Sequence, residues 1–180
     1  MKIYLAGPDV FQPDAIDIGK RKVALCAQYG FTGHYPLDNK IDLAAPDASL
    51  QIFRANQALM DQSDAIIANL TPFRGPSADA GTVYELGYMA GKGKRCFGYC
   101  NVASRYADRV RAANAVTIDD GRLIDAEGLS VEDFGHADNL MIVHALDDHG
   151  APLVTPARTP ADIWHDLACF EACLRRAAAQ

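Results

Sequence analysis

Residues 64–92 read DAIIANLTPFRGPSADAGTVYELGYMAGK, and this stretch decides the fold. Its first part, 64–70, is almost unbroken in apolar character, which is typical of a strand buried on both faces of a parallel sheet. A loop with glycine and two prolines follows at 71–78, and the spacing of apolar residues predicts a helix from Asp79 to about Gly91. The stretch therefore predicts a buried strand that opens into a loop and then a helix.

The same alternation of strand and helix extends outward from this stretch. We expect further strands at 2–6, 31–36 and 95–99, and helices at about 13–29 and 48–62. The connections are too long for hairpins, so the crossovers are expected to be right-handed and the strands parallel. The predicted fold class is α/β, with a doubly wound parallel sheet of about five strands and helices on both faces.

The C-terminal part of the chain has a weaker pattern. Residues 100–137 are expected to form an excursion with a small hairpin, because Asp120-Gly121 is a turn signal between two short extended runs. A helix is predicted at 138–145. A final helix is predicted at about 159–178, because Trp164, Leu167, Phe170 and Leu174 are spaced to share one face. We expect residues 1–180 to form a single domain.

Composition excludes several classes of function. With a formal net charge of -6, the 180-residue chain lacks the basic surface that nucleic-acid binding requires. No apolar run is long enough to span a membrane or to act as a signal peptide. The five cysteines lack a Cys-x-x-Cys pair, and the histidines lack the i, i+4 pairing with a glutamate that marks a zinc helix. We expect a cytoplasmic protein with reduced thiols and no metal or cofactor.

Signature motifs of nucleotide and ester chemistry are also missing. The glycines form neither the dinucleotide-binding G-x-G-x-x-G pattern nor a Walker loop, and no serine lies in a G-x-S-x-G context. A phosphate-cradling NTPase and a serine hydrolase are therefore disfavoured, and a small-molecule substrate remains the expected partner.

In doubly wound sheets, ligands bind outside the carboxyl ends of the strands where the strand order reverses. This rule selects the loops at 7–11, 38–40 and 71–79. Together with the helix that follows the third loop, they bring Tyr4, Asp38, Asp79 and Glu85 within reach of one crevice.

Two of these carboxylates each allow two interpretations. Asp79 begins its helix, where it can cap the backbone N–H groups or serve in catalysis. Glu85 has apolar neighbours in sequence, and an unpaired buried carboxylate usually has a partner or a catalytic role. The alternative is that Glu85 lies on the solvent side of an amphipathic helix. Gly81 and Gly87 leave room for a ligand beside this helix, yet helical geometry does not decide between the two interpretations.

Four segments of the chain resemble the nucleoside 2-deoxyribosyltransferase family. The segments are KIYLAGPDVF at 2–11, PLDN at 36–39, SDAIIANLTPFRGPSADAGTVYELGYMAGKGK at 63–94 and GHADNLMI at 135–142. The most specific part is the D-x-G-x-x-x-E-x-G core, from Asp79 to Gly87. The resemblance implies a flavodoxin-like sheet and exchange of the base on a 2′-deoxynucleoside, with a free nucleobase as the second substrate.

The resemblance also implies roles for individual residues. Glu85 would be the nucleophile that attacks C1′, Tyr4 would orient it by a hydrogen bond, and Asp79 would protonate the departing base. The expected substrate-binding residues are Gly7, Asp38, Asn39, Asn56, Gly81 and Asn139. Asn139 would reach the sugar in a neighbouring subunit of a homo-oligomer, and a helix cap is its simpler alternative.

Two departures limit this transfer, and two other functions compete with it. Many bacterial members carry an aspartate where this chain has Asn56, and many end in a tyrosine whereas this chain ends RRAAAQ. One alternative is a 2′-deoxynucleoside 5′-monophosphate N-glycosidase, for which Arg74 and Ser77 could supply a phosphate pocket. The second alternative is a non-catalytic nucleotide-sensing module, which would not need the combination of Tyr4, Asp79 and Glu85.

Overall fold

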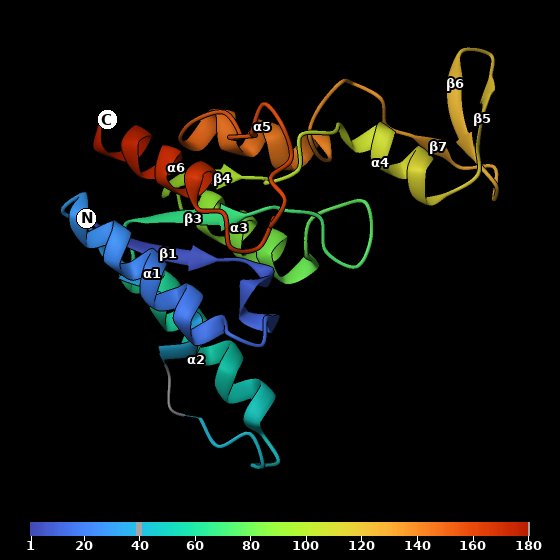
Figure 1. Ribbon diagram of the computed structural model, residues 1–180. Helices are drawn as coiled ribbons and strands as arrows, with labels where there is room; N and C mark the ends of the chain where they lie inside the picture. The colour runs from blue at the N-terminus through green and yellow to red at the C-terminus, as the bar shows by residue number, and fades with distance from the viewer. Residues whose placement is uncertain (39–40, 180) are drawn as a thin grey trace.

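A computed structural model describes residues 1–38 and 41–179, and its centre is a parallel sheet (Figure 1). Within the described residues this sheet has four strands in the order β2-β1-β3-β4. The strands are β1 (Lys2–Ala6), β2 (Thr32–His34), β3 (Ala65–Asn69) and β4 (Arg95–Tyr99). All three neighbouring pairs are parallel, so the predicted doubly wound parallel sheet is confirmed.

A complete fifth strand, expected from the sequence, is replaced by a partial one. Residues 150–154 lie beside β4 and form two isolated parallel bridges with it. The N–H of Val154 donates to the Gly98 carbonyl at 3.0 Å, and the Val154 carbonyl accepts from the Cys100 N–H at 2.9 Å. Pro152 lies between the bridges and has no N–H to donate, which prevents a continuous ladder.

Helices cover both faces of the sheet, as predicted. Alternate side chains of β1 point to opposite faces, so Ile3 and Leu5 join one hydrophobic cluster and Tyr4 and Ala6 join the other. The helices α1 (Ala15–Gln28) and α6 (Ala168–Ala178) contribute to the first cluster, while α2 (Ala48–Gln62), α3 (Ala80–Gly91) and α5 (Leu140–His149) contribute to the second.

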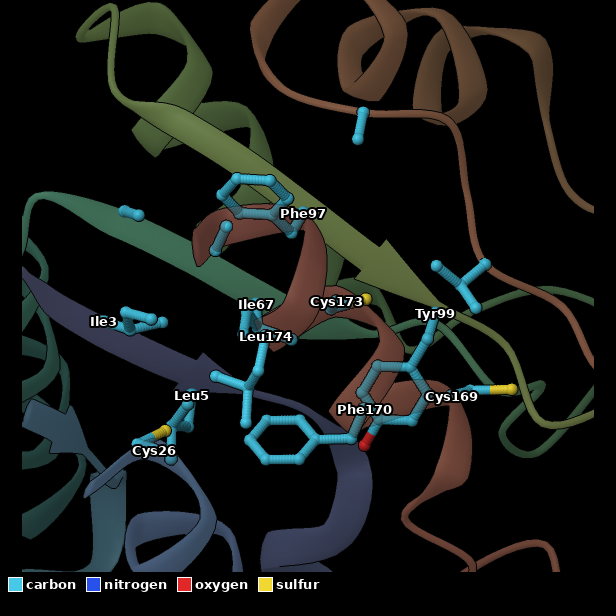
Figure 2. Close-up of a cluster of buried hydrophobic side chains, with 14 of the residues drawn as sticks. Ile3, Leu5, Cys26, Ile67, Phe97, Tyr99, Cys169, Phe170, Cys173 and Leu174 are labelled. Atoms are coloured by element: carbon cyan, nitrogen blue, oxygen red, sulfur yellow. The ribbon is translucent and has the colours of Figure 1, made fainter. Parts of the chain in front are cut away.

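The first cluster joins the C-terminal helix to the sheet. Figure 2 shows Phe170 and Leu174 of α6 beside side chains of β3 and β4. Tyr99 of β4 meets Phe170 edge to face, with ring centroids 6.0 Å apart. Cys169 and Cys173 are buried in the same cluster, and all five cysteines are free thiols. Burial raises the pKa of Cys173 to about 12, so this thiol stays protonated and packs as a small apolar group.

The final helix is shorter than the predicted 159–178, because the residues before Ala168 form a turn. The Asp162 carboxylate accepts hydrogen bonds from the backbone N–H groups of Trp164 and His165, both at 3.1 Å. Trp164 therefore lies outside α6. Its ring packs edge-on against the Phe73 ring, with the ring centroids 6.2 Å apart. The pattern used to place Trp164 on the helix was misleading, since local side-chain bonds to the backbone compete with helix formation.

The excursion at 100–137 contains α4 (Tyr106–Ala113) and a small antiparallel sheet, and it projects away from the main sheet (Figure 1). Its strands are β5 (Val116–Asp119), β6 (Arg122–Asp125) and β7 (Ser130–Val131). The predicted turn at Asp120-Gly121 is confirmed, with φ of 44° and 76° as a type I′ turn requires. None of the helices in the described ranges is long and apolar enough to cross a membrane.

Candidate active site

The candidate site lies at the switch point of the sheet, where the carboxyl ends of β1 and β3 diverge into loops. The chain leaves β1 through Gly7 into the short 3-10 helix η1 (Pro8–Phe11), and it leaves β3 through the loop that ends at Asp79. A cavity of about 430 Å³ opens between these loops and α3, within the size range of small-molecule sites.

Tyr4 and Glu85 meet at the inner end of this site. Tyr4 is fully buried in the middle of β1, and its hydroxyl donates a hydrogen bond to Glu85 Oε1 at 2.5 Å. Glu85 lies in the second turn of α3, is partly buried and lines the cavity. The structure therefore decides against Glu85 as a solvent-side residue. Tyr4 holds one carboxylate oxygen, and the cavity gives a ligand access to the carboxyl group.

The surroundings of Glu85 change its acidity. Burial raises the pKa of Glu85, the hydrogen bond from Tyr4 lowers it, and the nearby charge of Asp79 raises it, with a net value of about 7 against an ordinary 4.5. Burial and the Glu85 carboxylate together raise the pKa of Tyr4 well above its ordinary value. Tyr4 therefore stays a hydrogen-bond donor, while Glu85 changes charge near neutral pH.

Asp79 caps α3 and also faces the cavity. Its Oδ2 accepts from the backbone N–H of Thr82 at 2.9 Å and from the Thr82 hydroxyl at 3.0 Å. Within the described residues, Asp79 Oδ1 has no hydrogen-bond partner. A side chain at Gly81 would place its Cβ 3.1 Å from Asp79 Oδ2, so glycine there leaves the carboxylate undisturbed at the cavity wall. The two interpretations of Asp79 are thus compatible, because one oxygen caps the helix and the other is available to a ligand.

Asn56 presents an unsatisfied oxygen in this cavity. It lies on α2 and lines the cavity together with Glu85. Its Oδ1 is buried and has no hydrogen-bond partner within the described part of the chain. Because a buried acceptor without a donor is unfavourable, such groups usually find a partner in water or a ligand. The arrangement suits recognition of a ligand N–H or O–H group.

Gly7 is required by close packing under the cavity wall. A Cβ at this position would lie 2.6 Å from Asp9 Oδ2 and 2.7 Å from the Cβ of Asn69. Asp9 is itself buried, and it pairs with the buried ammonium group of Lys22 at 2.5 Å and accepts from Asn69 Nδ2 at 2.8 Å. This buried network fixes the backbone of η1, which forms one wall of the cavity.

The remaining predicted residues fall in different places. Asp38 ends the short 3-10 helix η2 (Pro36–Asp38), whose first two residues line the Glu85 cavity, whereas Asn39 lies outside the described residues. Asn139 caps α5 by accepting from the Met141 N–H at 3.0 Å. Asn139 lines a second cavity against Ala80, Val83 and Gly87 on a different face of α3. Within one chain, the structure therefore does not bring Asn139 into the Glu85 cavity.

Most of the cavity wall consists of residues that the sequence did not single out as site residues. Thr82 could have been found from its position three residues after the helix cap, and Phe11 from its place in the first loop. Val10 lies in the same loop, and Pro36 and Leu37 belong to the PLDN segment. The other apolar wall residues carried no signal, because they come from an irregular segment and from the rim of α2. The missed lining residues are Val10, Phe11, Pro36, Leu37, Ile41, Leu43, Ile52 and Thr82.

Fold and cavity together define a doubly wound α/β protein with a partly buried carboxyl group at the switch point of its sheet. The sequence profile of the family described as nucleoside 2-deoxyribosyltransferase matches residues 3–141, most of the chain. The chain therefore belongs to the nucleoside 2-deoxyribosyltransferase family. An uncharacterized protein of Schizosaccharomyces pombe is 36% identical over 155 residues, covering 77% of this chain and 74% of the relative.

Solved structures share the fold. A 2-deoxyribosyltransferase from Leishmania mexicana is 28% identical with a TM-score of 0.67, and the match covers 99% of this chain and 97% of that one. A conserved protein of Enterococcus faecalis V583 is 22% identical with a TM-score of 0.59 over 98% of both chains. A 2-deoxyribosyltransferase from Bacillus psychrosaccharolyticus is 18% identical with a TM-score of 0.56, over 93% and 90% of the two chains. The last two likenesses show the fold alone.

Proposed function

We propose that this protein transfers the 2-deoxyribosyl group of a 2′-deoxynucleoside to another nucleobase by double displacement. The observation that carries the proposal is the hydrogen bond between Tyr4 and Glu85 at the end of the cavity. The Tyr4 hydroxyl oxygen lies 2.5 Å from Glu85 Oε1. A carboxyl group with one oxygen held and a cavity before it has the geometry of a nucleophile. A pure binding module would not need such a group, which favours catalysis over sensing.

In the first step, Glu85 attacks C1′ of the nucleoside in its carboxylate form. A bond forms between a Glu85 carboxylate oxygen and C1′, the bond from C1′ to the base nitrogen breaks, and the base leaves with the electron pair. The two carboxyl groups hold one proton between them; in the reactive form this proton lies on Asp79, which donates it from its free oxygen to the departing ring nitrogen. The absence of a 2′-hydroxyl on the sugar favours the oxocarbenium-like transition state.

In the second step, a free base takes the place of the first. Its ring nitrogen attacks C1′, Glu85 leaves as a carboxylate, and Asp79 accepts the proton that the base loses. Two inversions restore the starting configuration at C1′, as in retaining glycosidases. Asn56 supports recognition of the base, because its buried Oδ1 can accept from a base N–H.

Two observations support nucleoside exchange over hydrolysis of a nucleoside monophosphate. Neither Arg74 nor Ser77 is among the described residues that line the Glu85 cavity. The Arg74 guanidinium lies over the rings of Phe11 and Phe73, 5.4 and 4.6 Å from their centroids. The Ser77 hydroxyl donates to Asp138 at 2.6 Å. The Ser77 hydroxyl is thus engaged elsewhere, and the Arg74 guanidinium stacks on two rings without lining the cavity.

Asn139 fits the proposal through a second copy of the chain. Its side chain lines a cavity of about 560 Å³ on a different face of α3 from Glu85, with Oδ1 accepting from the Met141 N–H and Nδ2 donating to the Glu132 carboxylate. We propose that a neighbouring subunit supplies its own Asn139 to the Glu85 cavity to contact the sugar.

The decisive experiment combines product analysis with detection of the intermediate. Deoxyinosine and adenine should give deoxyadenosine and hypoxanthine. In the absence of an acceptor, mass spectrometry should find one deoxyribosyl group on the tryptic peptide 75–92, which contains Asp79 and Glu85 as its acidic residues. Fragmentation should place the adduct on Glu85. An adduct on Asp79, or cleavage of deoxyguanosine monophosphate without any exchange product, would contradict the proposal.

A further inference from the structure

Asp138 is a buried carboxylate that the proposed reaction does not use. The residue is 2% exposed and lies directly before Asn139 in the chain. Its Oδ1 accepts from the Ser77 hydroxyl at 2.6 Å and from the Asn139 N–H at 2.8 Å. Its Oδ2 accepts from the Ala78 N–H at 3.0 Å and lies 3.4 Å from Arg109 Nη2. The carboxylate thus has four donors from three separate segments of the chain.

Arg109, on α4, completes the network from the other side. The residue is 9% exposed, and its guanidinium donates to the carbonyls of Pro76 at 2.7 Å and of Ser104 and Ala137 at 2.6 Å. These carbonyls belong to the loop before α3, the approach to α4 and the segment before α5. The planar guanidinium can bind all of them at once because its five N–H groups point in fixed directions.

The ion pair holds the residues that immediately precede Asp79 and Asn139 in the chain. Ala78 precedes Asp79, and Asp138 precedes Asn139. The loop at 71–79 contains glycine and two prolines, and one backbone hydrogen bond crosses it, from Phe73 N–H to the Ser77 carbonyl at 3.0 Å. Its attachment to Asp138 therefore sets where Asp79 begins α3.

We propose that Asp138, charged and paired with Arg109, is a positioning residue. It fixes Asp79 at the leaving base, and it also holds Asn139, the residue that follows Asp138 in the chain. This inference rests on the proposed function. The negative charge is essential, because in Asp138→Asn the amide nitrogen replaces one acceptor oxygen. Either the Ser77 and Asn139 donors or the Ala78 and Arg109 donors then face an N–H₂ group, and the loop must move to relieve the clash.

The test uses two nucleosides whose bases need different help to leave. Hypoxanthine leaves deoxyinosine with a proton from Asp79, whereas 7-methylguanine leaves 7-methyl-2′-deoxyguanosine as a neutral molecule without protonation. Single-turnover base release by Asp138→Asn should fall about 100-fold with deoxyinosine, the loss expected for a catalytic group displaced by about 1 Å. Release from 7-methyl-2′-deoxyguanosine should fall about threefold or less, since general acid catalysis is not required there.

Two further variants separate positioning from stability. Ser77→Ala removes one of the four donors and keeps the charge, so it should show the same substrate selectivity with a smaller loss, about tenfold with deoxyinosine. Tyr29→Phe removes the hydrogen bond to Glu171, 2.7 Å long and joining α1 to α6, and should leave both rates unchanged. If Asp138→Asn does not fold, Ser77→Ala still decides the question.

Two outcomes would overturn the positioning role. One is an equal loss in the rate of base release with both nucleosides, and the other is base release at the parent rate in folded Asp138→Asn and Ser77→Ala. If the wild-type protein releases no base from either nucleoside and forms no adduct, the proposed function itself fails and the inference falls with it. The two failures are distinguishable, because the first requires an active wild-type protein whose Glu85→Ala variant is inactive.

Discussion

The Tyr4 hydroxyl donates its hydrogen bond to Glu85 across 81 positions of sequence, from the middle of β1 to the second turn of α3. Both side chains lie on the α3 face of the sheet, and the parallel registry of β1 with β3 brings their elements together. The contact links the proposed nucleophile to the most buried part of the fold. The pKa of Glu85 can therefore be tested by substitution of either Tyr4 or Glu85.

Tyr4→Phe should shift the pH dependence of the reaction. The Tyr4 hydrogen bond lowers the pKa of Glu85, so its removal should raise that pKa above the present value of about 7. Glu85 must be ionised to attack, so the acidic limb of kcat/KM against pH should move to higher pH by about one unit. An acidic limb that stays near pH 7 in folded Tyr4→Phe would show that Tyr4 does not tune the nucleophile.

Glu85→Gln should abolish exchange and stabilise the protein at alkaline pH. The pKa of Glu85 is raised in the folded state from 4.5 to about 7, so the folded protein holds this proton more tightly than the unfolded chain. The contribution of protonated Glu85 to stability is fully present below pH 4.5 and is lost as the pH rises through 7. Glutamine can still accept from Tyr4 and carries no charge.

The gain in the free energy of unfolding should reach up to about 3 kcal/mol at pH 8 and shrink as the pH is lowered toward 5. Urea unfolding of the parent protein and Glu85→Gln at both pH values measures this difference. Val154→Ala, which shortens a buried apolar side chain beside β4, serves as a control whose effect should not depend on pH in this window. A constant difference between the parent and Glu85→Gln would mean that the pKa of Glu85 is not raised.

Asn56→Ala should weaken substrate binding without weakening the fold. Asn56 Oδ1 is buried with no partner in the described ranges, so its removal should change the free energy of unfolding by less than about 1 kcal/mol. If the oxygen accepts from the substrate base, KM should rise about tenfold, the equivalent of one hydrogen bond. Asn69→Ala is the matched control, because Asn69 donates to buried Asp9 and its loss should reduce stability. A KM unchanged in Asn56→Ala would remove Asn56 from the site.

The sequence was informative where a local pattern coincided with a structural requirement. The apolar run of β3 and the turn at Asp120-Gly121 depend on neighbouring residues, and each was predicted, while the cap at Asp79 was one of two interpretations. The family resemblance then predicted a role for Glu85, which helical spacing had left open. A solvent-side glutamate and one beneath a cavity have the same neighbours in sequence.

The parts that could not be predicted depend on contacts between distant segments. Arg109 and Asp138 lie 29 positions apart, and Ser77 and Asp138 lie 61 apart, so no periodicity joins them. The early part of the predicted final helix does not form, because the Asp162 carboxylate accepts hydrogen bonds from backbone N–H groups there. The apolar spacing that includes Trp164 gave no sign of this. The placement of Asn139 on a different face of α3 from Glu85 likewise follows from packing rather than from sequence.

Gly7→Ala should reduce both stability and activity, because the wall of the cavity cannot accommodate a Cβ at this position. The added carbon would lie 2.6 Å from Asp9 Oδ2 and 2.7 Å from the Asn69 Cβ, and both groups are buried and held by other bonds. Relief requires the backbone of η1 to move away from the Lys22 ion pair, at a cost of about 1–3 kcal/mol in the free energy of unfolding.

Because η1 also forms a wall of the Glu85 cavity, KM for the nucleoside should rise in Gly7→Ala while the pH at which Glu85 titrates stays near 7. Gly30→Ala is the comparison for loss of a glycine elsewhere: its φ of 76° strains any other residue, but a Cβ there meets no atom within 4 Å. It should lower the stability without changing KM. A Gly7→Ala protein with parent KM would show that the wall of η1 does not shape the substrate site.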